Sequence, residues 1–108
     1  MRYCLALDLK DDPALIAEYE RQHEKISPVI EASIRDAGVT DMQIFRVGTR
    51  LFMIMETDET FSFERKAAMD AANPAVQAWE TFVDQFQQRL PFAQDGEKWV
   101  LMQPIFSL

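Results

Sequence analysis

Two side chains near the start of the sequence have the chemistry of an acid–base site. His23 is the only histidine of the chain, and Tyr19 stands four residues before it. On a helix this spacing places both side chains on one face, with their β-carbons about 5–6 Å apart. An imidazole gives and takes protons near neutral pH, and a phenol donates or accepts a hydrogen bond. The pair is suited to proton transfer, although two core residues with satisfied polar tips would show the same spacing.

Other kinds of catalytic site find little support in the chain. Cys4 is the only cysteine, which excludes an internal disulfide and a thiolate metal site. The three glycines are scattered, so there is no Gly-rich phosphate loop. A single histidine would need several converging carboxylates to hold a metal ion. We therefore expect no metal and no cofactor, and any acid–base enzyme built from this chain is expected to use His23.

Length and charge narrow the class of protein further. The 108 residues predict one domain over residues 1–108. A formal net charge of −7 argues against nucleic acid and anionic membranes as partners, because both need a basic patch. Acidic residues from Asp8 onwards interrupt the first apolar run, so it does not resemble a signal peptide. These features predict a cytoplasmic enzyme or binding protein.

The spacing of apolar residues predicts the elements that must position Tyr19 and His23. The order is strand, helix, strand, strand, helix, strand, the split βαβ plan of an α+β ferredoxin-like sandwich with a four-stranded antiparallel sheet. The expected elements are a strand at 3–9, a helical region at 13–37 that kinks or restarts at Ser27-Pro28, strands at 42–47 and 51–56, a helical region from 60 to 90 that breaks near 71–72, and a strand at 99–106. The last helix carries an apolar stripe of Val76, Trp79, Val83, Phe86 and Leu90.

The two strands of the hairpin are apolar on both faces. Residues 42–47 and 51–56 place large apolar side chains at odd and at even positions alike. A sheet of this kind must be covered on both faces. Two helical regions can cover only one face, so we expect a homodimer formed through the open face of the sheet.

The ordered set of motifs resembles the L-rhamnose mutarotase family over nearly the whole chain. Tyr19 and His23, followed by Ile26 and Pro28, are similar to a Tyr-x-x-x-His-x-x-(Ile/Val)-Trp-Pro segment of that family. The stretch 72–79, Ala-Asn-Pro-Ala-Val-Gln-Ala-Trp, is similar to its Asp-Pro-x-x-Gln-x-Trp-Trp segment, and the residues from Trp99 to Phe106 are similar to its aromatic-rich final strand.

The resemblance implies a dimeric α/β barrel that interconverts the α and β anomers of 6-deoxy sugars. By this resemblance His23 is the catalytic proton donor, while Tyr19, Trp79 and Trp99 surround the sugar. The reaction needs an acid for the ring oxygen and a base for the O1 proton, and it needs no metal or nucleotide. Trp79 also lies in the apolar stripe of its helix, so a core role stays open beside the role in the pocket.

Three positions depart from the family pattern. Ser27 stands where the family has Trp, Glu80 stands at the second Trp of the pair, and Met42 stands where a substrate-contacting Tyr is expected. We hypothesise that the reaction is retained and that the sugar differs, with L-fucose or another deoxy or uncommon hexose competing with L-rhamnose. Met42 and Glu80 then belong to the sugar-binding residues, and Glu80 is a candidate partner for a sugar hydroxyl.

Two other functions remain open at this stage. One is a cofactor-free monooxygenase or isomerase of the dimeric α/β-barrel type, since one fold hosts many chemistries. The other is a dimer that binds a ligand without catalysis. The Tyr19–His23 pair favours the mutarotase over both.

Overall fold

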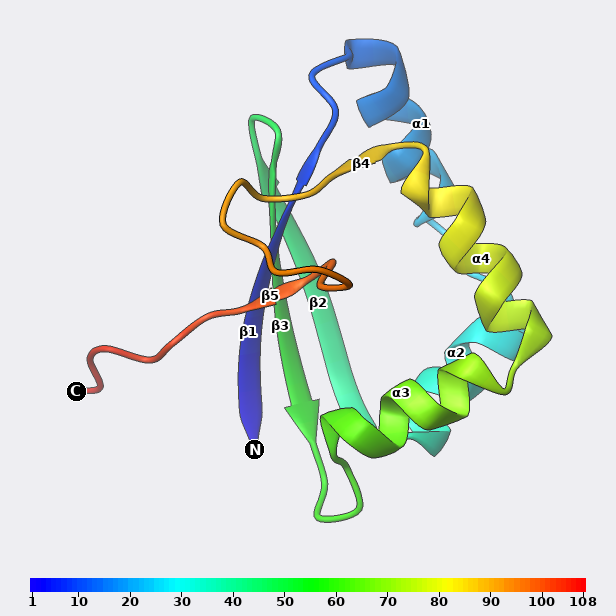
Figure 1. Cartoon of the computed structure of the whole chain (residues 1–108), viewed down its shortest axis with the longest axis vertical. Helices are drawn as coiled ribbons and strands as arrows, with labels where there is room; N and C mark the ends of the chain where they lie inside the picture. The colour runs from blue at the N-terminus through cyan, green and yellow to red at the C-terminus, as the bar shows by residue number, and fades with distance from the viewer.

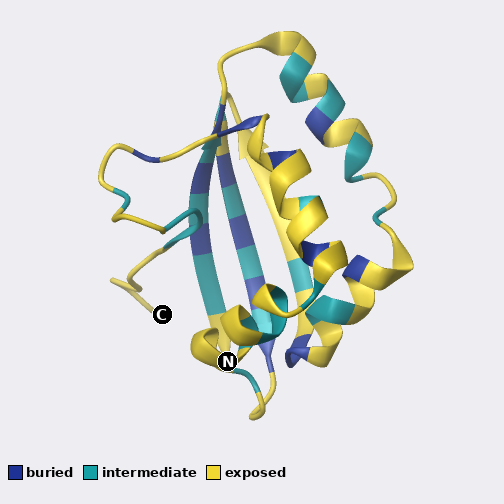
Figure 2. Cartoon of the chain, turned by 45° about the vertical axis from the view of Figure 1, so that its right-hand side comes forward, coloured by how far each residue is buried: buried dark blue, intermediate teal, exposed yellow.

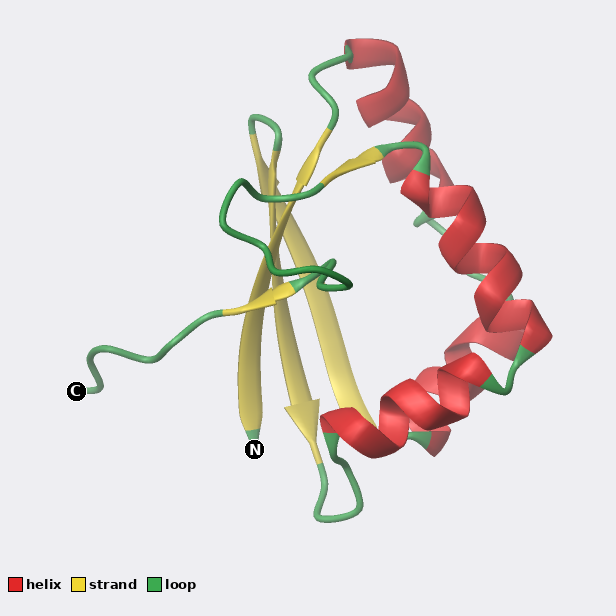
Figure 3. Ribbon diagram, viewed as in Figure 1, coloured by secondary structure: helices red, strands yellow, loops and turns green.

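The computed structural model describes all residues from 1 to 108. Its elements are β1 (Arg2–Leu9), α1 (Pro13–Gln22), α2 (Pro28–Asp36), β2 (Val39–Val47), β3 (Arg50–Thr57), α3 (Phe63–Ala71), α4 (Pro74–Asp84), β4 (Gln87–Gln88) and β5 (Val100–Leu101). The antiparallel sheet has the order β2-β3-β1-β4, and β5 also pairs with β1. All four helices lie on one face of the sheet (Figures 1 and 3). The fold is the predicted ferredoxin-like α+β arrangement.

Polar caps followed by proline set the starts of three helices, as predicted. The side chain of Asp12 accepts hydrogen bonds from the backbone N–H groups of Ala14 and Leu15 at the start of α1. Ser27 caps α2 in the same way, so the first helical region stops and restarts instead of bending. Asn73 caps α4. A capping side chain satisfies donors that have no partner inside the helix, and proline fits the first helical position.

The core lies between the sheet and the helices. Alternate residues of β1 and β3 are buried against the helical layer, and Figure 2 shows this alternation along both strands. Two clusters result. One joins Leu9, Tyr19, Leu51, Val83 and Phe86, and the other joins Leu5, Val39, Met53 and Met55. Trp99 packs against both clusters, which ties the last segment of the chain to the core.

The prediction that the last helix continues to Leu90 was wrong. Helix α4 ends at Asp84, and Gln87 pairs with Leu9 in the sheet. Phe86 and Leu90 are nevertheless buried, because the turn and the chain that follow α4 can bury them as well as a helix can. The backbone of β1 also needs hydrogen-bond partners along its second edge, and the N–H of Lys10 donates to the carbonyl of Phe86 at 2.9 Å. The spacing of apolar residues alone could not show that the edge of β1 needs these hydrogen-bond partners.

The prediction of a last strand over 99–106 was too long. Only Val100–Leu101 pair with β1, and the N–H of Met102 then donates to the carbonyl of Cys4 at 2.7 Å. Proline has no N–H to donate, and Pro104 stands just beyond the point where pairing stops. Residues 103–108 are exposed, and the tail leaves the sheet on the side opposite the helices (Figure 1).

The face of the sheet opposite the helices keeps apolar side chains in solvent. Phe45 is 51% exposed and Val47 is 77% exposed. Both lie on β2, which has no helix on this side (Figure 1). The predicted apolar character of the second face is therefore present in the folded chain. No helix has the length and apolar character needed to span a bilayer.

Candidate active site

Tyr19 is the buried anchor of the site. It lies in the last half of α1, and only 4% of its surface is exposed because Leu9, Val83 and Phe86 pack around it. Burial raises the pKa of Tyr19 above its usual value of 10.0. The phenol is therefore neutral in ordinary buffers and keeps a hydrogen that it can donate.

His23 lies where helix α1 ends. It is the C-cap residue, and its backbone N–H donates to the carbonyl of Glu20 at 3.1 Å. Its ring lies against that of Tyr19 at an interplanar angle of 34°, with 4.3 Å between the ring centroids. The prediction that the two side chains share one side of the helix is confirmed, although His23 is the residue that closes the helix and not an interior one.

A hydrogen bond decides which nitrogen of His23 is free to react. The Nδ1 atom lies 2.8 Å from the backbone carbonyl oxygen of Tyr19. A carbonyl oxygen only accepts hydrogen bonds, so Nδ1 must carry the hydrogen. Nε2 is then the nitrogen that takes or gives a proton, and the bond to Tyr19 also fixes the orientation of the ring.

Trp79 closes the site from α4. The centroid of its ring lies 5.4 Å from that of His23, so the imidazole contacts Tyr19 and Trp79 at once. Trp79 is half-buried and packs against the core cluster around Tyr19. It packs against the core and also lines the cleft described next, so its position is compatible with both roles that the sequence left open.

A cleft of about 970 Å³ lies between the helices and the sheet. Its volume is at the upper end of what small-molecule sites in proteins use. All six residues predicted for the site line it, although they come from four separate parts of the chain. These residues are Tyr19, His23, Met42, Glu80, Trp79 and Trp99. Met42 belongs to β2 and faces Met55 across the sheet, so it contributes to the floor of the cleft.

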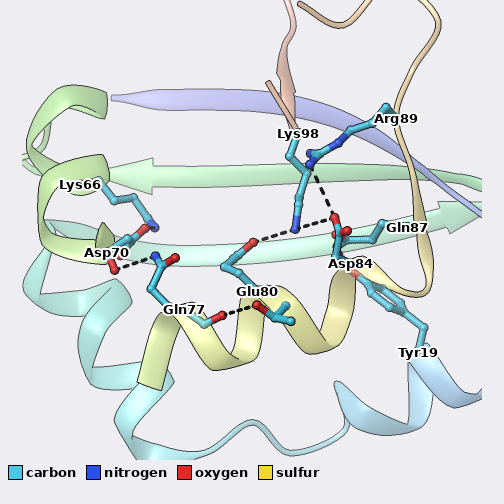
Figure 4. Close-up of polar contacts among 10 residues, drawn as sticks. Tyr19, Lys66, Asp70, Gln77, Glu80, Asp84, Gln87, Arg89 and Lys98 are labelled. Carbon is cyan, nitrogen blue, oxygen red and sulfur yellow. Dashed lines mark hydrogen bonds and ion pairs between the residues drawn. The ribbon is translucent and has the colours of Figure 1, made fainter. Parts of the chain in front are cut away.

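Lys98 joins the segment before β5 to helix α4 across the cleft. Its ammonium lies 2.8 Å from a carboxylate oxygen of Glu80 and 3.5 Å from one of Asp84, as Figure 4 shows. Only 16% of the Lys98 side chain is exposed. Glu80 thus carries a charge partner, and its carboxylate keeps further lone pairs for a hydroxyl group.

Two residues of the cleft were missed by the sequence analysis. Gln87 donates a hydrogen bond from Nε2 to the hydroxyl oxygen of Tyr19 at 3.3 Å, and Lys98 pairs with Glu80. Both line the cleft. The predicted helix placed Gln87 without reference to Tyr19, and no spacing in the sequence linked Lys98 to α4. To predict the role of Gln87, the sequence would have had to indicate that α4 ends at Asp84.

The chain is similar to known proteins over nearly its whole length. The profile of a family described as L-rhamnose mutarotase matches residues 2–108. An L-fucose mutarotase from Xanthomonas campestris pv. campestris is 46% identical over 109 residues, which cover 99% of this chain and 87% of that protein.

Two solved structures share the fold. An L-rhamnose mutarotase from Formosa agariphila superposes with a TM-score of 0.74 at 19% identity, covering 100% of this chain and 98% of the other. Tetracenomycin F2 cyclase from Streptomyces glaucescens, a type II polyketide cyclase, superposes with a TM-score of 0.60 at 21% identity over 100% and 96% of the two chains. At these identities the two structures support the fold alone.

Proposed function

Because the chain belongs to the L-rhamnose mutarotase family and is a sugar mutarotase, we propose that it interconverts the α and β anomers of a 6-deoxy hexose. L-Fucose is the first candidate and L-rhamnose the second. The 46% identity to an L-fucose mutarotase over nearly the whole chain supports this order. The replacement of two aromatic positions of the family pattern by Met42 and Glu80 supports a sugar other than L-rhamnose.

The placement of His23 carries the proposal for the mechanism. When the ring of the sugar opens, the ring oxygen gains a proton, the bond between C1 and the ring oxygen breaks, and the proton on O1 leaves to a base. His23 as imidazolium donates the first of these protons through Nε2, since Nδ1 is bound to the carbonyl of Tyr19. Reclosure on the other face of C1 reverses the transfers and gives the second anomer. A positioned acid of this kind typically contributes about 10²–10⁴-fold in rate.

The remaining cleft residues would hold the sugar. The aromatic faces of Trp79 and Trp99 offer apolar surface for the C–H groups and the C6 methyl of a deoxy sugar, and Met42 adds to this surface from the sheet. Tyr19 and Glu80 supply hydrogen bonds to hydroxyl groups. The cleft therefore offers both polar groups and apolar surface, as the binding of a 6-deoxy sugar requires.

Saturation transfer between the α and β anomeric protons tests the reaction. We expect the protein to speed exchange of L-fucose more than exchange of L-rhamnose, and His23→Ala to lose this acceleration. Gln22→Ala is the matched control, because Gln22 is the neighbouring residue and bonds to Glu18 away from the cleft. A His23→Ala protein with the wild-type rate would contradict the proposed role of His23.

The same samples separate the two rival functions. Oxygen uptake with an aromatic substrate, without anomer exchange, would favour a cofactor-free monooxygenase. A sugar that raises the melting temperature without speeding exchange would favour a non-catalytic binding dimer.

We further propose that two copies associate through the open face of the sheet, in the cytoplasm. Exposed Phe45 and Val47 support this interface, since burial of such side chains favours association. Light scattering should give twice the mass of the chain for the wild type and the mass of one chain for Phe45→Glu. Ala17→Glu, which adds the same charge on the helical side, is the control and should remain dimeric. Cell fractionation tests the location.

A further inference from the structure

Gln87 is a buried amide whose two ends differ in their bonding. The residue is 8% exposed, and its Nε2 donates to the hydroxyl oxygen of Tyr19. Its Oε1 atom is buried and has no hydrogen-bond partner. A buried acceptor without a partner is destabilising.

The hydroxyl of Tyr19 is left with a hydrogen to donate. A phenol has one donor hydrogen and accepts at its oxygen. The oxygen accepts from Gln87, and the hydroxyl donates to no group of the protein. Because the NH₂ group of an amide cannot accept, the phenolic hydrogen is turned away from Gln87. Tyr19, Glu80 and Lys98 all line the cleft, and Figure 4 shows Tyr19 and Gln87 on the same side of α4 as Lys98.

The backbone holds Gln87 in place for this contact. Gln87 pairs with Leu9 in the sheet, and the neighbouring carbonyl of Phe86 accepts from Lys10 at 2.9 Å. The end of α4 at Asp84 is what allows this pairing. The amide of Gln87 therefore projects from β4, a strand that is paired with β1.

Tyr19 thus links two polar groups of the site. Its hydroxyl accepts from Gln87, and its backbone carbonyl accepts from Nδ1 of His23. The hydroxyl of Tyr19 is therefore oriented by Gln87, and the backbone carbonyl of the same residue orients the imidazole of His23. A change at Gln87 acts on Tyr19 first, and it leaves the bond that orients His23 intact.

We propose that Gln87 is a positioning residue that directs the phenolic hydrogen of Tyr19 into the cleft, where it donates a hydrogen bond to an oxygen of the bound sugar beside His23. The inference rests on the proposed mutarotase function. No bond is made or broken at Tyr19; the hydroxyl stays intact and stabilises negative charge that develops on the sugar oxygen during ring opening. If the amide were turned over, Tyr19 would donate to Gln87 and this hydrogen would be lost to the substrate.

Three variants test the role of Gln87 in anomer exchange. Gln87→Met removes the donor at similar size, Gln87→Glu replaces the donor by an acceptor that captures the phenolic hydrogen, and Gln88→Met is the matched control at the exposed neighbouring position. We expect the first two to lower kcat by about 10- to 100-fold with a smaller change in KM, the size seen when partners that orient metal ligands are removed. Gln88→Met should keep the wild-type rate.

Combination with Tyr19→Phe separates positioning from a general structural effect. Once the phenol is gone, Gln87→Met should cause no further loss of kcat, because its effect acts through the hydroxyl. An undiminished loss in the Tyr19→Phe background would overturn the proposal. So would a Gln87→Met protein that matches Gln88→Met in kcat. Melting curves identify any variant that does not fold, and Gln87→Glu provides the second substitution in that case.

A measurement without sugar keeps this inference separate from the proposed function. In a Tyr3→Phe background Tyr19 is the only tyrosine, and its ionisation can be followed by ultraviolet absorbance. Loss of the hydrogen bond from Gln87 should raise the pKa of Tyr19, since that bond favours the phenolate. An unchanged pKa in Gln87→Met would overturn the contact. If the wild type accelerates neither sugar, the proposed substrates fail while the titration still decides whether Gln87 controls the phenol.

Discussion

The imidazole of His23 is held by the backbone of the residue on which it stacks. Nδ1 of His23 lies 2.8 Å from the carbonyl oxygen of Tyr19, and the two rings are 4.3 Å apart at their centroids. A four-residue spacing at the end of a helix allows both contacts, because the last carbonyls of a helix have no partner within it. His23 satisfies one of these carbonyls and is oriented by it, leaving Nε2 for the substrate.

Two substitutions at His23 separate orientation from chemistry. The amide of Asn can replace Nδ1–H as the donor to the carbonyl of Tyr19, whereas the amide of Gln reaches the position of Nε2. We expect both His23→Asn and His23→Gln to slow anomer exchange by about 10²–10⁴-fold, because neither amide transfers protons near neutral pH. His23→Asn should keep a melting temperature closer to the wild type. Wild-type exchange by either variant would show that the imidazole is not the acid.

Burial of Tyr19 predicts a loss of stability in strong alkali. The pKa of Tyr19 is raised in the folded protein, so the unfolded chain releases the phenolic proton first as the pH increases. Its contribution to stability is therefore complete below pH 10 and declines as the pH rises towards the folded pKa. Denaturant unfolding should show that the free energy of unfolding falls with pH less steeply above pH 10 in Tyr19→Phe than in the wild type. Equal slopes would contradict the prediction, and Tyr3→Phe serves as the control.

The ion pairs of Lys98 predict an effect on substrate binding. Lys98 joins the segment before β5 to Glu80 and Asp84 on α4, at the border of the cleft. Lys98→Met should raise KM several-fold and leave kcat nearly unchanged, because the segment is freed while His23 stays in place. The cost in stability should be about 1 kcal/mol or less, since the carboxylates are half-exposed. A fall in kcat with an unchanged KM would refute this assignment. Lys10→Met, which removes an exposed charge elsewhere, is the control.

Gly38 predicts a strong effect on folding without a role in catalysis. Its backbone has φ of +102°, and an added β-carbon would lie 2.7 Å from Oδ1 of Asp58 and 2.7 Å from Oγ1 of Thr60. Gly38→Ala should lower the free energy of unfolding by about 1–3 kcal/mol or more, because a strained backbone and a close contact coincide. Gly48 has φ of +58°, and a β-carbon added there would meet no atom within 4 Å. Gly48→Ala should therefore lower the free energy of unfolding by less, as measured in a denaturant titration. Equal losses would show that the close contact has no effect.

Local signals in the sequence were enough for most of the architecture. Asp12, Ser27 and Asn73 each precede a proline and cap a helix, and both choices act within one turn of the chain. Alternation along β1 and β3 set which residues face the helices. The Tyr19–His23 pair also followed from sequence, since residues four apart on a helix meet without help from the rest of the fold.

Interactions between distant segments decided the rest. The sequence alone determined the order of the helical regions and of the strands β1, β2 and β3, the helix caps and the pairing of Tyr19 with His23. Apolar spacing predicted that α4 continues to Leu90. In the structure Gln87 and Gln88 instead pair with the free edge of β1. That exchange of a helical turn for a strand is what brings Gln87 to Tyr19, 68 positions away in the chain. The contact of Lys98 with Glu80 has the same origin. The backbone must satisfy its hydrogen bonds across the sheet, and its partners there are distant residues that no local sequence pattern identifies.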